Sequence, residues 1–314
     1  LAYIICLILH RLVIWPFFLS PLRKVPGPPV GNLILGQSRV IITSETGIPQ
    51  REWVKKYGPV VRIVGPVGVE RLIFMKPDTL HQILVKDWLQ YPRPGYLRNI
   101  LGTVTGYGLL TVTGDEHKQM RKAMNPAFSI PNLMAQTHMY WESIEGLVSI
   151  LKDQLGTGSD GRVVHVYDWM SKVTLDIICE TAFGYKTDSL HNPHNELAVA
   201  YEKLIALQSG ASIRVVNTWK VTWGEDAEEF RPSRWLNLPP DYHPSFSMLS
   251  FIAGPHACIG KTMSIIEMKA VLAGLITNFE FEPAFEGQKA KPAAAITIKP
   301  TDGMPLRVRR VRRS

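Results

Sequence analysis

The stretch with the clearest capacity for chemistry is Phe251–Gly260, which has the sequence FIAGPHACIG and holds one cysteine, Cys258. Directly after it, apolar residues recur at helical spacing from Lys261 to Leu275, with no proline between them. A cysteine at the start of a helix lies where the helix dipole favours an anion, and Gly254 and Gly260 let backbone N–H groups approach the sulfur. A thiolate stabilised in this way can act as a nucleophile, a redox thiol or a metal ligand.

The positions of the cysteines narrow these alternatives. No second cysteine stands two or three residues from Cys258, which disfavours a zinc cluster or a redox pair, whereas a single axial thiolate suits a haem iron. The pattern Phe-x-x-Gly-x-x-x-Cys-x-Gly, formed by Phe251, Gly254, Cys258 and Gly260, resembles the haem-binding signature of the cytochromes P-450. The resemblance implies that Cys258 ligates iron and that the other three positions bind the cofactor. The alternative for a lone cysteine is a buried structural thiol.

The signature departs from the family pattern at two positions. His256 stands where the family usually has arginine, and Ile252 stands where it often has glycine. By resemblance, His256 donates to a haem propionate, but with a weaker and pH-dependent charge.

A second pair of donors precedes this stretch. His117 and Arg121 are four residues apart in a predicted helix that opens at Gly114, so they share one face and can hold one carboxylate. The family has Trp-x-x-x-Arg here, which implies that Arg121 binds a haem propionate and that His117 replaces the tryptophan. The alternative is a solvent-exposed basic face, because Lys118 and Lys122 are neighbours.

Three further segments of this chain have the spacing of motifs of the family. Pro232–Trp235 resembles its meander motif, with Ser233 in place of glutamate, and Arg234 would there meet a Glu-x-x-Arg pair. Ala273–Thr277 has the pattern of the oxygen-side helix but follows the cysteine, and Glu228–Arg231 has the Glu-x-x-Arg spacing but overlaps the meander. We therefore predict that neither segment performs the family role, and no catalytic residue is assigned.

The elements that must position these residues indicate a mainly α fold with small β-sheets. The resemblance implies that this is an incomplete P-450-like haem-thiolate fold. Helices are expected over 49–57, 78–85, 133–155, 166–183 and 195–206, and strands over 60–64 and 71–75. The resemblance covers 25–210 and 216–306. Only about fifteen residues lie between Leu207 and Trp223, too few for the family's oxygen-side and Glu-x-x-Arg helices, so we expect a deletion near 208–217.

The N-terminus predicts a membrane anchor over 1–20. Leu1–Leu19 is almost wholly apolar, and 19 residues at about 1.5 Å each nearly span a hydrocarbon core of about 30 Å, although His10 and Arg11 are costly there. Basic residues at 23–24 favour a cytosolic domain. A proline-rich hinge is expected over 21–30 and the haem-thiolate domain over 31–314. The alternative for the first segment is a buried helix.

Composition excludes several classes of protein. The chain has 314 residues, of which 46% are hydrophobic and 20% charged, so it is neither disordered nor fibrous. Three scattered cysteines exclude a disulfide framework and suggest reducing surroundings. Lys and Arg number 35 against 27 Asp and Glu, and part of this excess is the run Arg307–Arg313. We interpret the run as a solvated charged tail and expect no nucleic-acid partner; a nucleic-acid or anionic-lipid patch is the alternative.

The function implied by the resemblance is that of a haem-thiolate monooxygenase. Such a protein carries heme b (iron protoporphyrin IX with an axial thiolate), takes electrons from an NADPH-dependent reductase and inserts one oxygen atom of O₂ into an apolar small-molecule substrate. Its expected place is the endoplasmic reticulum membrane, held by a single-pass anchor. Two alternatives stay open: a haem-binding but catalytically impaired or truncated product, and a membrane-anchored adaptor without enzymatic activity, which leaves the motifs unexplained.

Overall fold

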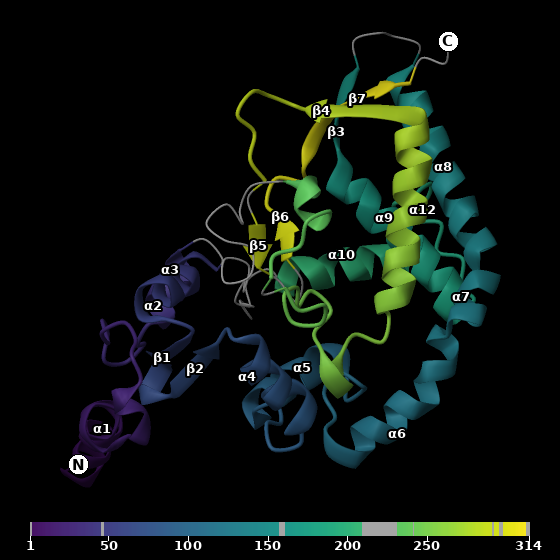
Figure 1. The fold of residues 1–314 in the computed structure, drawn as a ribbon. Helices are drawn as coiled ribbons and strands as arrows, with labels where there is room; N and C mark the ends of the chain where they lie inside the picture. Colours follow the sequence, from purple (N-terminus) through teal and green to yellow (C-terminus); the bar gives the residue numbers. More distant parts are fainter. Residues whose placement is uncertain are drawn as a thin grey trace. The chain divides into compact units, whose positions relative to one another are not determined.

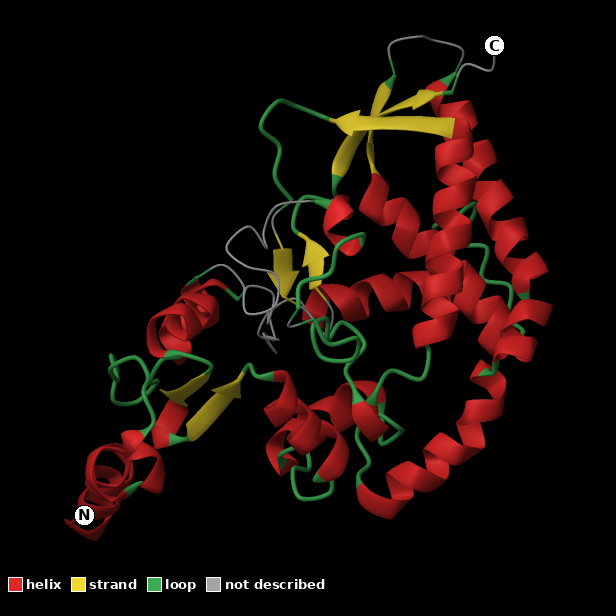
Figure 2. Cartoon of the chain, in the orientation of Figure 1, coloured by secondary structure: helices red, strands yellow, loops and turns green. Residues whose placement is uncertain are grey.

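The computed structural model describes residues 2–44, 47–156, 161–208, 231–240, 242–290, 292–294 and 298–311. The chain forms two compact units, Leu1–Gly106 with Arg214–Cys258 (unit 1) and Tyr107–Ile213 with Ile259–Ser314 (unit 2). Helices dominate the described residues and the strands are few and short, as the secondary-structure colours of Figure 2 show, which confirms the predicted mainly α fold.

Unit 1 begins with the apolar N-terminal segment and is built around one hairpin (Figure 1). Strands β1 (Val60–Val64) and β2 (Glu70–Phe74) pair antiparallel, with Val60 opposite Phe74. The inward residues of the hairpin pack with helix α3 into a small core of Val54, Val61, Ile63, Ile73 and Met75. The other elements of unit 1 are α1 (Ala2–Leu9), η1 (His10–Leu19), η2 (Pro21–Lys24), α2 (Ser38–Thr43), α3 (Ile48–Tyr57), η3 (Pro66–Gly68), α4 (Pro77–His81), η4 (Gln82–Lys86), α5 (Gly95–Thr105), η6 (Pro232–Trp235) and η7 (Gly254–His256).

Unit 2 is a helical bundle capped by a sheet (Figure 1). Its elements are α6 (Gly114–Met124), η5 (Asn125–Phe128), α7 (Ile130–Ala135), α8 (Thr137–Leu155), β3 (Arg162–His165), α9 (Val166–Phe183), α10 (Glu196–Gln208), α12 (Lys261–Asn278), β4 (Phe279–Pro283), β5 (Pro292–Ala294), β6 (Ile298–Pro300) and β7 (Pro305–Arg310). The predicted helix over 133–155 is interrupted at Gln136, between α7 and α8.

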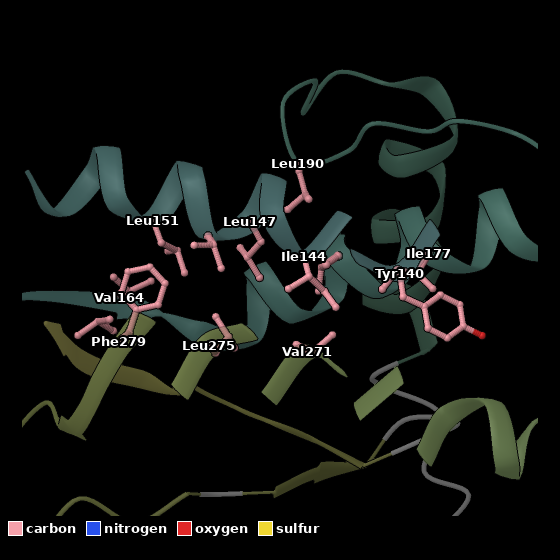
Figure 3. Close-up of a cluster of buried hydrophobic side chains, with 13 residues drawn as sticks. Tyr140, Ile144, Leu147, Leu151, Val164, Ile177, Leu190, Val271, Leu275 and Phe279 are labelled. Atoms are coloured by element: carbon pink, nitrogen blue, oxygen red, sulfur yellow. The ribbon is translucent and has the colours of Figure 1, made fainter. Parts of the chain in front are cut away.

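The core of unit 2 lies where α8, α9 and α12 meet. Tyr140, Ile144, Leu147 and Leu151 follow one face of α8 at spacings of three and four residues, and all are buried against side chains of α9 and α12 (Figure 3). At Gly274 of α12 an added Cβ would stand 2.4 Å from Cγ2 of Ile144, so the two helices approach more closely there than a side chain allows. Cys179 of α9 is buried as well, with 3% of its surface exposed.

The interpretation of the C-terminal basic run as a solvated tail is wrong for its described part. Residues up to Arg310 form β7, the central strand of the three-stranded sheet β3-β7-β4. The alternation of arginine with apolar residues has the period of a strand, so Val308 is buried while Arg309 donates to Oε2 of Glu282 on β4 at 2.8 Å.

Candidate functional site

The loop that ends at Cys258 folds back on itself. The N–H group of Cys258 donates to the carbonyl of Phe251 at 2.8 Å, and that of Ala257 donates to the carbonyl of Gly254 at 2.9 Å. These bonds close a turn around Gly254–His256. Cys258 itself is a free cysteine with an exposed side chain. The structure thus presents the thiol at the end of a shaped loop rather than in the core, which argues against the buried structural thiol.

Gly254 allows this loop to pack closely against η4 within unit 1. Its φ is +73°, and an added Cβ would lie 2.1 Å from the carbonyl oxygen of Leu84 in η4. Only glycine tolerates both the left-handed conformation and the contact. His256 packs edge-on against Trp88 with ring centroids 5.2 Å apart, and Ala253 is buried with Leu80 and Phe246 in a second small cluster.

Ile252 occupies the same loop under backbone strain. Its φ is +56°, in the left-handed region that a β-branched residue rarely adopts. The signature that this loop resembles often has glycine at this position, and glycine adopts the left-handed conformation without strain. The left-handed conformation costs a non-glycine residue about 1–2 kcal/mol.

Arg93 is a residue of unit 1 that the sequence analysis missed. Its Nη1 atom is buried and has no hydrogen-bond acceptor among the described residues, and burial lowers the pKa of the guanidinium. A buried arginine donor without an acceptor is costly, so an anionic ligand would satisfy it. The only sequence signal is the arrangement Tyr91-Pro92-Arg93-Pro94, a basic residue fixed in a loop with no acidic neighbour at hand.

The predicted donor pair of helix α6 belongs to unit 2. His117 is buried, with 2% of its surface exposed, which contradicts a fully solvated basic face. Arg121 is half-buried, and its Nε donates to Oδ1 of Asn125 at 3.2 Å. Lys118 is exposed and pairs with Asp115 at 2.9 Å. His117 and Arg121 are therefore less exposed to solvent than Lys118, which lies between them in the sequence. Gly260, also in unit 2, is the N-cap residue of α12.

A second feature that the sequence did not indicate is a buried carboxyl in unit 2. Glu267 of α12 lines a cleft of about 260 Å³ together with Thr174, Tyr201 and Met263, among other residues. Its Oε1 is buried without a hydrogen-bond donor among the described residues, and burial raises its pKa to about 7. The hydroxyl of Tyr140 is likewise buried without a described partner, and its pKa is raised by burial and by the charge of Glu267.

The segments rejected as motif matches behave as ordinary structure where they are described. Thr277 donates its hydroxyl to the carbonyl of Ala273 within α12, at 2.6 Å. Arg234 belongs to the segment that resembles the meander motif, which was not rejected; it lies in η6 and is half-buried. The predicted deletion near 208–217 falls outside the described residues after position 208, as do the first three positions of Glu228–Arg231. Among the described residues, no three His, Cys, Asp or Glu side chains gather as a metal-binding group.

Comparison with known proteins places these residues in a family. Residues 24–224 and 212–305 match the sequence model of the cytochrome P450 family. A cytochrome P450 monooxygenase of Gibberella moniliformis is 30% identical over 208 residues, which are 63% of this chain and 35% of the relative. One of Postia placenta is 33% identical over 196 residues, 62% of this chain and 36% of the relative. The matched part of the chain thus spans about a third of the length of these relatives.

Proposed function

The chain belongs to the cytochrome P450 family, and we propose on that premise that it is a haem-thiolate monooxygenase. The observation that carries the proposal is the Cys258 loop. Its free thiol is exposed at the end of a turn that Gly254 seats against the backbone of η4. A thiolate at this exposed position is free to act as a ligand of an iron atom.

The family implies a haem cofactor, and the residues of unit 1 suit heme b. Cys258 would supply the thiolate that binds the iron, and the buried donor of Arg93, which has no acceptor among the described residues, would suit a propionate. We assign propionate contacts also to His256, Arg121 and His117, and close backbone approach to Gly254 and Gly260, with Phe251 lining the thiolate loop. Haem bound there would supply the oxygen chemistry of the family, the transfer of one oxygen atom of O₂ to an apolar substrate.

The partners follow from the same premise. An NADPH-dependent reductase supplies the electrons, and the substrate is an apolar small molecule. The helical segment Ala2–Leu19 is long and apolar enough to cross a membrane, and we assign it to the endoplasmic reticulum, with the remainder of the chain in the cytosol.

A second candidate function is a protein that binds haem but turns over poorly. The observation that favours it is the short sequence between Leu207 and Trp223, about fifteen residues, which is too short for the family's oxygen-side and Glu-x-x-Arg helices. In the described part, the one segment with the oxygen-side pattern uses its threonine hydroxyl within α12. This candidate predicts haem binding together with oxygen reduction that is not coupled to substrate.

The carbon monoxide difference spectrum of the reduced protein tests thiolate ligation. The wild type should give the Soret band of a thiolate–haem complex, and Cys258→Ala should lose it. Cys6→Ala is the matched control, because Cys6 is also a free, exposed cysteine. Absence of haem uptake by the wild type would refute both candidate functions. Product formed per NADPH consumed, measured with a reductase and apolar substrates, then separates the two.

A further inference from the structure

The two halves of the apolar N-terminal segment differ in their environment. No residue of α1 (Ala2–Leu9) is buried. The second half, η1 (His10–Leu19), contains the fully buried Pro16 and is followed by Ser20, which is also fully buried. By average hydropathy the whole segment passes as one apolar helix, and the polar residues His10 and Arg11 stand where its two halves meet.

A buried polar cluster around Glu70 holds the second half to the hairpin. Glu70 of β2 accepts hydrogen bonds from Nε1 of Trp15 at 3.1 Å and from the hydroxyl of Ser20 at 2.8 Å. It also pairs with Arg62 of β1 at 2.6 Å, and both side chains of this ion pair are largely buried, 9% and 13% exposed. Arg62 in turn donates to the carbonyl oxygen of Pro16 at 2.6 Å. One carboxylate and one guanidinium thus connect both strands to the end of η1.

Backbone packing extends this attachment to the start of η1. An added Cβ on Gly68, at the tip of the hairpin, would lie 2.5 Å from the carbonyl oxygen of Arg11. The neighbouring residue Val67 donates its N–H group to the carbonyl of Ile34 at 2.7 Å. Both Val67 and Ile34 expose more than half of their surface. The hairpin tip therefore contacts η1 and lies beside an exposed apolar surface formed by Val67 and Ile34.

We propose that the bilayer boundary crosses the N-terminal segment at His10–Arg11. Ala2–Leu9 enters the hydrocarbon, whereas His10–Leu19 belongs to the folded unit and lies at the membrane–water interface. An ion pair with three further polar partners is costly at hydrocarbon depth, and so is the arginine at position 11, so both favour the interface. The exposed aromatic residues Phe17 and Phe18 and the apolar tip residues Ile34 and Val67 contact the lipid headgroup region.

This inference rests on the proposed membrane attachment and revises the predicted anchor over 1–20. It also replaces the expected hinge over 21–30 with a segment that hydrogen bonds hold against unit 1. Pro26 accepts a hydrogen bond from the N–H group of Arg62 at 2.9 Å, and Gln37 donates to the carbonyls of Pro28 and Pro29. The orientation of unit 1 on the bilayer is then set by the Glu70 cluster rather than left to a flexible spacer.

Photo-crosslinking of the full chain in phosphatidylcholine vesicles tests the depth of each half. Benzoylphenylalanine is placed at Ile5, at Phe18 or, as a control, at the exposed Glu52 of α3. We expect adducts deep in the acyl chain from Ile5, adducts near the glycerol from Phe18 and none from Glu52. Equally deep adducts from Ile5 and Phe18 would overturn the proposed boundary but keep the membrane attachment. No lipid adduct from Ile5 would overturn both.

Limited trypsin digestion of the vesicle-bound chain tests the Glu70 cluster. Glu70→Gln should raise the rate of cleavage after Arg11 by on the order of tenfold, because breaking a buried pair frees the segment. Trp15→Phe removes one hydrogen bond and should give a smaller increase in the same rate, without disturbing the ion pair. Glu52→Gln is the control for lost surface charge. If all three variants match the wild type, η1 is not held by Glu70.

Discussion

Replacement of the buried carboxyl of unit 2 by its neutral isostere, Glu267→Gln, should stabilise the protein in a pH-dependent manner. Burial raises the pKa of Glu267 from 4.5 to about 7, so the folded chain binds more protons than the unfolded chain between these two values. The free energy of unfolding therefore falls as the pH rises through this window. A pKa change of this size corresponds to on the order of 3 kcal/mol at pH 8.

Glutamine resembles the protonated carboxyl in shape and charge, so the variant should escape this loss. We expect Glu267→Gln to be close to the wild type near pH 5 and more stable by on the order of 2–3 kcal/mol near pH 8. Native-state hydrogen exchange of the backbone amides of α8 and α12 measures the free energy locally, where Tyr140 and Glu267 lie. Glu280→Gln, at an exposed position of β4, controls for the change in net charge.

A wild type whose exchange free energy is constant between pH 5 and pH 8 would refute this reasoning. So would a Glu267→Gln variant that is less stable than the wild type at pH 8. Either result would mean that the folded chain keeps the carboxylate solvated or paired, so that its pKa is not raised.

Three further predictions concern the loop and the donors around the proposed cofactor. Ile252→Gly should raise the free energy of unfolding of unit 1 by about 1 kcal/mol, because relief of the left-handed strain is partly offset by the entropy of glycine, and urea denaturation checks this. Gly254→Ala should abolish the carbon monoxide spectrum, since its Cβ would overlap the carbonyl of Leu84; retention of the full spectrum would show that the loop can move away from η4. Arg121→Ala should weaken the free energy of haem binding by about 1.5–3 kcal/mol if Arg121 binds a propionate, whereas Lys118→Ala should leave it unchanged. The pyridine haemochrome assay measures the haem occupancy of both variants. Equal occupancy would assign both residues to a solvated face.

Several features of the fold were predictable because they depend on local pattern. The 3.6-residue periodicity over 166–183 predicts α9 with its observed bounds, and the β-rich runs on either side of Gly65 predict the hairpin to within one residue. The structure of the basic C-terminal run was mispredicted as a solvated tail, because it depends on pairing with distant strands rather than on local pattern. Arg307 and Arg309 look solvated one by one, and only pairing of β7 with two other strands gives Val308 a buried position.

The chemistry of the candidate site was likewise visible in part. The sequence by itself singled out Cys258 as the candidate thiolate ligand, because spacing to glycine and the onset of a helix are properties of contiguous residues. Arg93 and Glu267 could not be found in this way. A charged side chain becomes unusual only when burial removes its water, and burial depends on packing with residues distant in the chain.

The N-terminal segment shows most clearly which properties the sequence determines and which only the tertiary structure decides. Composition determines that Leu1–Leu19 is apolar and long enough for a membrane, since hydropathy is a sum over neighbouring residues. The tertiary structure alone decides that its second half is attached to the hairpin, because Trp15 meets Glu70 across 55 positions of sequence. An ion pair and its partners are defined by distances of about 3 Å, and no local pattern specifies which distant residues reach that distance.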